Sequence, residues 1–170
     1  MRIVVVSDTH IPGRAKRLPA RLIRELRGCD AVLHAGDWTR WSVYETFAAF
    51  APTTGVAGNN DGPDIVRRLG LRRVVELNGC RIGIVHGHGG TGRRETEANA
   101  LRAFAGEKLD MIVYGHTHIP VNKIMADGIR VFNPGSPTDK RRQRFYSFGL
   151  LHVEDGEIVA LEHVFYLDKN

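Results

Sequence analysis

The sequence predicts an α/β fold with mixed sheets and helices on their outer faces. Apolar strand-like runs alternate with helical patterns over residues 2–69, which favours parallel strand–helix–strand units. Later in the chain, three dipeptides typical of hairpin turns each separate two strand-like runs: Asn78-Gly79, Asp127-Gly128 and Asp155-Gly156. We therefore expect the second half to be largely antiparallel, and two packed sheets would accommodate both patterns.

Length and composition indicate one soluble domain. The 170 residues, 42% of them hydrophobic, are enough for one well-buried core, so we expect a single domain over residues 1–170. The formal charge of +5 favours anionic partners such as phosphate esters or nucleic acid, although a solvated basic surface would give the same balance. No signal-peptide pattern and no membrane-length apolar stretch is present, so we expect a cytoplasmic protein without membrane contact.

The first strand is predicted over residues 2–7, a β-branched run that ends at Asp8-Thr9-His10. This ending places a carboxylate and an imidazole at the C-terminal tip of the strand, the edge where open α/β sheets keep their sites. Apolar positions then recur at helical spacing over residues 18–26, which predicts the first helix.

Residues 31–35 form a second short strand that runs into Gly36-Asp37, and the intervening helix favours a right-handed parallel crossover. The next helix is expected to begin at a capping box formed by Ser42 and Glu45. The expected apolar stripe of that helix consists of Trp41, Tyr44, Phe47 and Ala48.

A third strand, residues 54–57, leads into Gly58-Asn59-Asn60-Asp61-Gly62, and Pro63 suits the first turn of the following helix. In the second half, the strand over residues 81–85 ends in His86-Gly87-His88. A helix is expected over residues 93–104, with Ala98, Leu101 and Ala105 facing inward.

The strand over residues 111–114 ends in Gly115-His116-Thr117-His118. Because strand side chains repeat with period two, His116 and His118 are expected on one face of the extension. Two imidazoles so placed can reach one metal centre or two neighbouring ones.

Five predicted strands thus end in side chains that can bind metal. Each has an ordinary alternative on its own: a turn former, a helix cap, a left-handed loop residue or a buried histidine. A shared site at one sheet edge explains why apolar strands repeatedly stop at Asp, Asn or His beside Gly, and glycines there would let backbones approach closely. The candidate ligands are Asp8, His10, Asp37, Asn59, His86, His116 and His118, and the glycines are Gly36, Gly58, Gly87 and Gly115.

These five motifs, in this order and spacing, resemble the calcineurin-like metallophosphoesterase superfamily, and in particular its small uncapped microbial phosphodiesterase branch. Asn133-Pro134-Gly135-Ser136 is a further segment that resembles this family. The resemblance covers nearly the whole chain and implies a four-layer αββα sandwich with two divalent metal ions at the strand ends.

Carried over position by position, the resemblance assigns Asp8, His10, Asp37 and His118 to one metal. It assigns Asn59, His86, His116 and the bridging Asp37 to the other metal. It implies that Asp61 contacts the ligands and not the metal. Such mixed ligands suit Mn²⁺, Fe²⁺, Ni²⁺ or Zn²⁺ rather than Ca²⁺, and the family favours manganese. Two cations sharing one carboxylate imply hydrolysis of a P–O bond by metal-activated hydroxide.

Asn60 departs from many relatives, which have His there for leaving-group protonation or for stabilising charge on the phosphoryl group. An amide cannot act as a general acid, although it can donate a hydrogen bond to a phosphoryl oxygen. We therefore expect diesters or good leaving groups to be preferred, or His88 to replace the missing acid. The expected substrate is a small phosphodiester or nucleotide-like molecule.

Other candidates have simpler explanations. His34 is expected to be buried and hydrogen-bonded, and His152 and His163 to be structural or exposed. The basic run Lys140, Arg141, Arg142 and Arg144 is expected to form a solvated surface, or else to attract a polyanionic substrate.

Two rival functions remain open. In a binding scaffold, catalysis would be lost as in the retromer subunit that resembles these enzymes, but eroded ligands would then be expected. A small nuclease would use the same site, yet nucleic acid is less favoured because no aromatic interleaving or specificity domain supports it. Edge strands of the late hairpins could pair between subunits in a homo-oligomer.

Overall fold

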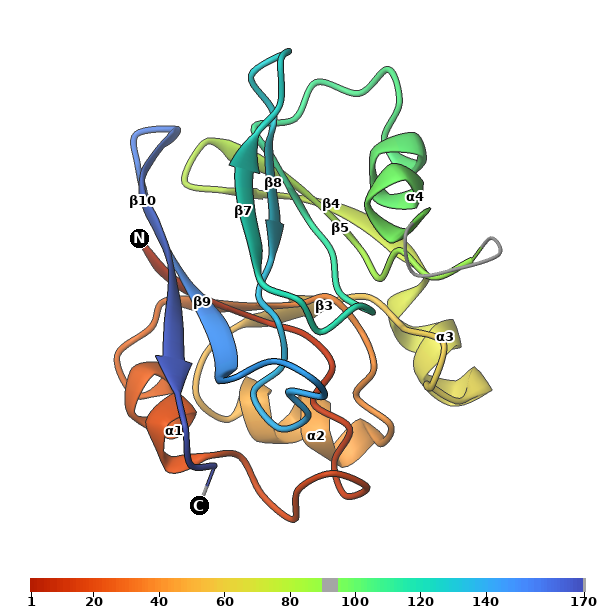
Figure 1. Cartoon of the computed structure of the whole chain (residues 1–170). Helices are drawn as coiled ribbons and strands as arrows, with labels where there is room; N and C mark the ends of the chain where they lie inside the picture. Colours follow the sequence, from red (N-terminus) through yellow and green to blue (C-terminus); the bar gives the residue numbers. More distant parts are fainter. Residues whose placement is uncertain (90–94, 170) are drawn as a thin grey trace.

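The computed structural model describes residues 1–89 and 95–169, and these contain two five-stranded sheets. The order of strands in the first sheet is β10-β9-β1-β2-β3, and in the second sheet it is β4-β5-β6-β8-β7 (Figure 1). Both sheets combine parallel and antiparallel pairs. The prediction of an α/β fold with mixed sheets is therefore confirmed.

The parallel core of the first sheet comes from the N-terminal third of the chain. Its strands are β1 (Arg2–Val6), β2 (Ala31–His34) and β3 (Thr53–Gly55), connected by helices α1 (Ala20–Leu26) and α2 (Trp41–Ala48). The hairpin of β9 (Tyr146–Glu154) and β10 (Glu157–Tyr166) joins this sheet antiparallel to β1, with Val4 opposite Leu150. The two ends of the described chain thus share one sheet.

The second sheet corrects one expectation. Its strands are β4 (Arg72–Leu77), β5 (Cys80–Val85), β6 (Met111–Val113), β7 (Val121–Ile124) and β8 (Arg130–Asn133). The predicted hairpins β4–β5 and β7–β8 are present, but β5, β6 and β8 run parallel to one another. Helix α4 (Thr96–Ala103) connects β5 to β6 and returns the chain to the same edge, so both sheets direct parallel strand ends towards the site.

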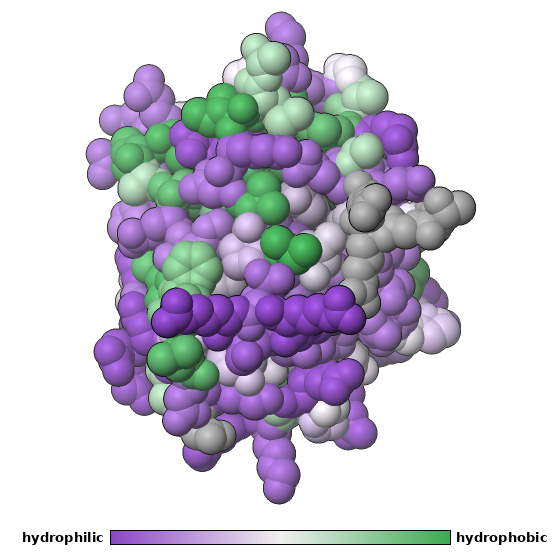
Figure 2. All heavy atoms as spheres, viewed as in Figure 1, coloured by the Kyte–Doolittle hydropathy of each residue, from purple (hydrophilic) through white to green (hydrophobic). Residues whose placement is uncertain are grey.

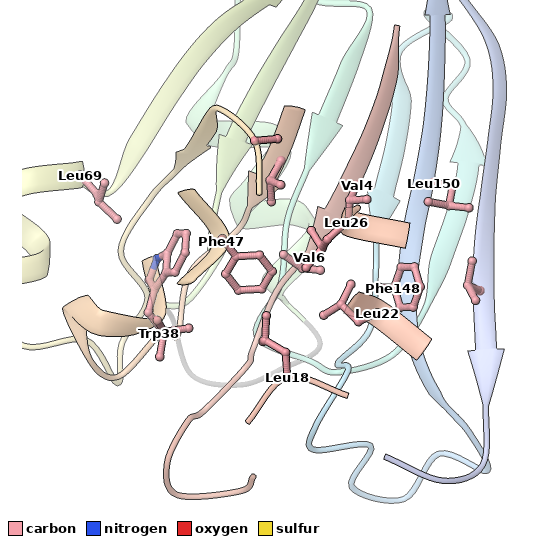
Figure 3. Close-up of a cluster of buried hydrophobic side chains, with 14 of the residues drawn as sticks. Val4, Val6, Leu18, Leu22, Leu26, Trp38, Phe47, Leu69, Phe148 and Leu150 are labelled. Atoms are coloured by element: carbon pink, nitrogen blue, oxygen red, sulfur yellow. The ribbon is translucent and has the colours of Figure 1, made fainter. Parts of the chain in front are cut away.

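Three hydrophobic clusters hold four layers together. One lies between the sheets and joins Ile3 and Val5 to Ile82 and Met111. A second packs α1, α2 and α3 (Pro63–Leu69) against the outer face of the first sheet, where the labelled side chains in Figure 3 point towards one another. The third packs α4 against the outer face of the second sheet. This arrangement confirms the four-layer αββα sandwich.

Helix α2 begins one residue before the expected capping box. Arg40 is the N-cap, and its carbonyl accepts a hydrogen bond from the Val43 amide, so Ser42 already lies inside the first turn. Val43 and Phe47 are buried whereas Ala48 is exposed, because the helix turns its 43/47 side towards Val32 and Trp38. The capping-box prediction and the placement of Ala48 were wrong.

Helix α4 also differs from its prediction. It begins at Thr96, and residues 93 and 94 of the predicted helix lie outside the described residues. Ala98 and Ala105 are exposed, while Ala100 and Phe104 are buried against β6 and β8. The large Phe104 ring decides which face of the helix is buried, whereas the prediction relied on the spacing of small alanines. No described helix has the length and apolarity that a membrane crossing requires.

Candidate metal centre

The predicted ligands meet where the C-terminal ends of β1, β2 and β3 face those of β5 and β6. The site therefore lies between two sheets, whereas the sequence led us to expect it at the edge of one. Hydrogen bonds join the loops within each sheet, from the Asp8 amide to the Gly36 carbonyl and from the Gly115 amide to the His86 carbonyl. Across the sheets, the His116 amide donates to Asp8 Oδ2 over 2.9 Å.

Asp8, His10 and His118 form one side of the centre. Asp8 Oδ1 lies 3.2 Å from His118 Nε2 and 3.7 Å from His10 Nε2, and the two imidazole nitrogens are 3.4 Å apart. All three atoms can face one cation. His10 Nε2 is also 3.5 Å from Asp37 Oδ2, which links this group to the second.

Asp37 and His86 form the other side, with 3.4 Å between Asp37 Oδ2 and His86 Nε2. Asn59 Oδ1 lies 3.2 Å from His86 Nε2 and 2.9 Å from His116 Nδ1. Asp8 Oδ1 is 3.9 Å from His86 Nε2, so it stands between both groups as well. The structure thus brings all seven predicted ligands together.

Backbone carbonyls fix two of the imidazole rings. His86 Nδ1 donates to the Ala35 carbonyl over 2.7 Å, and His118 Nδ1 donates to the Asp139 carbonyl over 2.5 Å. In both rings Nδ1 therefore carries a proton, and Nε2 faces the cluster, where it can bind a metal once it is deprotonated. Histidines that bind metals are held in this way in proteins.

The backbone at the site is unusual. Among the described residues, nine that are not glycine have positive φ, and five of these are predicted ligands with φ between 45° and 69°. They are Asp8, His10, Asp37, His116 and His118. This left-handed conformation is unfavourable for residues with a Cβ, and such strain gathers at functional sites.

Two glycines allow the loops to approach as closely as the site requires. A Cβ on Gly58 would lie 2.2 Å from Asp37 Oδ1, and a Cβ on Gly115 would lie 1.9 Å from Ser7 Oγ and 2.8 Å from Asp8 Oδ2. Any side chain at either position would displace a carboxylate of the centre.

The two carboxylates are held in their ionised form. Burial alone would raise the pKa of Asp8, but His86, His10 and His118 lower it well below its usual range. Burial would also raise the pKa of Asp37, but the neighbouring His86 outweighs this effect and lowers the pKa to about 2. Conversely, burial would lower the pKa of His86, whereas Asp8 and Asp37 raise it to about 9. Mutual attraction therefore keeps buried charges of both signs in one place.

A divalent cation fits this group of side chains. Asp8 is fully buried, and its Oδ1 accepts no hydrogen bond from the described residues, although three imidazole nitrogens lie 3.2–3.9 Å away. A cation bound among these atoms would satisfy this buried oxygen. Metal–ligand bonds of about 2.0–2.2 Å place neighbouring ligand atoms about 3.0–3.6 Å apart. The separations given above run from 2.9 to 3.9 Å, most of them within this range, and the cluster is therefore compatible with divalent metal binding.

Asn60 and Asp61 both contact Asp37. The backbone N–H of Asn60 donates to Asp37 Oδ1 over 2.8 Å, and the side-chain Nδ2 of Asn60 donates to Asp37 Oδ2 over 2.7 Å. Asp61 accepts hydrogen bonds from the amides of Asp37, Thr39 and Gly58. Asn60 therefore holds the carboxylate of Asp37, and Asp61 holds the backbone on both sides of it.

His88 lies beside the centre, with its ring centroid 5.4 Å from that of His86. Its Nδ1 is buried without a hydrogen-bond partner among the described residues. Burial and the neighbouring His86 lower the pKa of His88, which favours the neutral ring. The role of His88 as a substitute general acid stays a prediction.

His34 is buried and hydrogen-bonded, as expected. Its Nδ1 accepts from the Gly36 amide and its Nε2 lies 3.2 Å from Thr9 Oγ1, so neither nitrogen is free for a metal. His163 is half-buried, and its Nε2 donates to the Asn133 carbonyl over 2.8 Å.

Residues 133–136 and the basic run that follows them stood out in the sequence, but no contact between the loop after β8 and the candidate ligands was expected. Ser136 Oγ donates to the Asp8 carbonyl over 2.8 Å, and Thr138 Oγ1 donates to the Thr9 carbonyl. The backbone carbonyl of Asp139 accepts a hydrogen bond from His118 Nδ1, and the Asp139 side chain lies beside Arg14 and Arg141. Because β8 runs parallel to β6, its C-terminal end points to the same place, and that direction is the signal that could have identified this loop.

The fold and the cluster define a class: αββα proteins with a carboxylate–imidazole metal centre between the ends of two sheets. A family model described as a calcineurin-like phosphoesterase superfamily domain matches residues 1–156. The chain belongs to this superfamily.

Relatives agree with this assignment. A probable metallophosphoesterase of Methanothermobacter thermautotrophicus is 36% identical over 147 residues, covering 83% of this chain and 80% of the relative. A phosphodiesterase of Methanocaldococcus jannaschii is 28% identical over 149 residues, covering 79% and 83%.

Among solved structures, Vps29 of Entamoeba histolytica in complex with Zn²⁺ has a TM-score of 0.75 and 25% identity, with 98% of each chain covered. A Thermotoga maritima protein solved by NMR has a TM-score of 0.73 and 31% identity, with 97% and 99% covered.

Proposed function

We propose that this protein is a dinuclear metal-dependent phosphodiesterase. The observation that carries the proposal is the convergence of seven ligand-type side chains on one point, where Asp8 Oδ1 accepts no hydrogen bond from the described residues and Asp37 faces both halves of the cluster. Asp8, His10 and His118 would hold one cation, and Asn59, His86 and His116 the other, with Asp37 between them. Manganese is the metal we propose, and iron, nickel and zinc have compatible chemistry.

Two bound cations would supply an ionised water and a clamp for the non-bridging phosphoryl oxygens. The chain itself supplies orientation. Backbone carbonyls fix the rings of His86 and His118. Asn60 binds the side-chain carboxylate of Asp37, and Asp61 binds its backbone amide. The exposed Asn60 offers no general acid, which favours diesters with good leaving groups over monoesters.

Asp37→Asn tests the proposal. The change removes the charge expected to serve both cations, so metal content should fall and hydrolysis of an aryl phosphodiester should disappear. Asp64→Asn is the matched control, because Asp64 is an exposed carboxylate on α3 that pairs only with Arg67 and Arg68 in the described structure. An Asp37→Asn protein that is active and full of metal would refute the proposal.

The similarity to Vps29 favours a second candidate, a binding scaffold without catalysis. The zinc complex of that neighbour means that metal binding alone does not separate the two functions. Hydrolysis does, because a scaffold would bind metal and leave both diesters and monoesters intact. We favour the enzyme since all seven ligand positions are filled, and the single-domain organisation and cytoplasmic location remain predictions.

A further inference from the structure

A hollow of about 490 Å³ opens directly beside the candidate metal centre. His10 and Asn60 line its inner end, so it is continuous with the centre. Its other walls come from the loops after β1, β2 and β8 and consist of Pro12, Gly13, Arg14, Thr39, Arg40, Asp139 and Arg141. The hollow lies within the size range of small-molecule sites.

The walls of this hollow are strongly cationic. Three arginines line it, Arg14, Arg40 and Arg141, against one carboxylate among the described lining residues, Asp139. A neighbouring hollow of about 350 Å³ shares Arg14, Asp139 and Arg141 and adds Lys140 and Lys169. Hydrophilic residues also dominate the face shown in Figure 2, which includes the region where these loops lie in Figure 1.

Asp139 positions two of the arginines relative to the metal centre. Its Oδ2 lies 3.4 Å from Arg14 Nε and 3.8 Å from Arg141 Nε, and its backbone carbonyl accepts a hydrogen bond from His118 Nδ1. Its own amide donates to Ser136 Oγ over 2.8 Å. The guanidinium of Arg40, in contrast, has no ion-pair partner among the described residues, so its charge is not balanced by a neighbouring carboxylate.

The hollow is unsuited to a nucleobase. No aromatic side chain among the described residues lines the part beside His10 and Asn60. Tyr146 lines the neighbouring hollow, but Lys140 and Lys169 lie over its ring at 5.7 and 5.5 Å. Guanidinium groups bind phosphate oxygens through paired hydrogen bonds, and these walls therefore select charge rather than a flat ring.

We propose that Arg14, Arg40 and Arg141 form a subsite for a second phosphate group of the substrate, separate from the phosphate that is cleaved. The substrate class is then a small phosphodiester that carries a further phosphoryl group, such as a phosphorylated nucleotide ester. This inference rests on the proposed phosphodiesterase function, because it places the cleaved phosphate at the metal centre.

A matched pair of esters tests the subsite. Thymidine 5′-(para-nitrophenyl phosphate) and its 3′-phosphorylated counterpart differ by one phosphate and release the same chromophore. In manganese buffer the 3′-phosphorylated ester should have a KM about tenfold lower, which corresponds to about one charge-assisted hydrogen bond. Arg40→Gln and Arg141→Gln should each abolish most of this difference in KM between the two esters.

Arg24→Gln is the control variant, because Arg24 is an exposed arginine on α1 that lines neither hollow. It removes the same charge and should leave both KM values unchanged. Equal KM values for the two esters in the native protein, or equal losses in all three variants, would overturn the subsite and leave the phosphodiesterase function standing.

Calorimetric titration with thymidine 3′,5′-bisphosphate provides a readout that does not require turnover. The protein in manganese buffer should bind this probe more tightly than thymidine 5′-phosphate, and the preference should be lost in Arg141→Gln but kept in Arg24→Gln. If neither ester is cleaved, the proposed function fails while this titration still decides whether the subsite exists. The absence of any preference for the bisphosphate would refute it.

Discussion

Asp8 shows at the scale of one residue how strongly the site departs from ordinary structural chemistry. It is fully buried, has a left-handed backbone with φ of 55°, and has an Oδ1 that accepts no hydrogen bond from the described residues. Each feature is unfavourable for stability when taken alone. Their combination in one residue, repeated in part at Asp37, is explained by the cation that these oxygens would share.

His34 gives the metal-free protein a pH dependence. Burial lowers the pKa of His34 to about 3, below its ordinary value of 6.5. Between these values the unfolded chain binds a proton that the native protein does not, so the free energy of unfolding falls as the pH falls. The contribution is up to about 1.4 kcal/mol per pH unit.

Denaturant titrations with a chelator present, from pH 6.5 downward, would measure this effect. The stability of His34→Gln, although lower overall through loss of stacking on Trp38, should fall less steeply with pH than that of the native protein. Parallel curves for the two proteins would contradict the assigned surroundings of His34.

Asn60→His tests the account of leaving-group preference. An imidazole at this exposed position beside the centre could protonate a departing alkoxide, which an amide cannot do. We expect kcat/KM for alkyl phosphomonoesters to rise by up to about 10²-fold. The rate for an aryl diester should not rise, since its leaving group needs no acid, and it reports any loss caused by removing the hydrogen bond from Asn60 to Asp37. A ratio of monoester to diester activity that does not rise in this variant would show that the missing acid at position 60 does not limit the reaction.

At the scale of elements, the turns after β2 and β3 form one unit through Asp61. Its carboxylate accepts three amide protons, from Asp37, Thr39 and Gly58, over 3.0, 2.7 and 2.8 Å. Asp61→Ala would leave these amides unpaired and free the loop that presents Asp37. Metal affinity should fall by about 10–100-fold, the usual effect of removing the group that supports a ligand.

The affinity would be measured by titrating manganese into the metal-stripped protein. Asp64→Ala, which removes an exposed carboxylate three residues further on, should bind manganese as the native protein does. Asp61→Asn, which keeps one acceptor oxygen, should lose less affinity than Asp61→Ala. Native affinity in Asp61→Ala would show that the turns hold Asp37 without it.

Local patterns predicted the elements well where the signal is local. Asn78-Gly79 forms the turn of a hairpin, and Pro63 lies in the first turn of α3, because each depends on the conformation of its own residues. The rotation of α4 was missed because it depends on Phe104 packing on Ile112 and Val131, which are distant in sequence. The parallel pairing of β5, β6 and β8 also escaped, since no single segment encodes the neighbour of a strand.

At the scale of the whole molecule, the candidate centre exists only because two sheets meet. Asp8, His10 and Asp37 come from the first sheet, and His86, His116 and His118 from the second. The sequence identified all seven candidate ligands because each follows a predicted strand within a few residues, and their role as ligands stays a prediction. It did not reveal that the site spans two sheets, or that Arg14, Arg40 and Asp139 surround it, because these residues lie in loops without a periodic pattern.

The measurement that tests the account most directly is hydrolysis of an aryl phosphodiester beside its monoester, by metal-stripped protein with and without added Mn²⁺. The account predicts no turnover without metal, recovery with Mn²⁺, and a clear preference for the diester. A protein that binds two metal ions per chain and cleaves neither ester would contradict it and favour the scaffold.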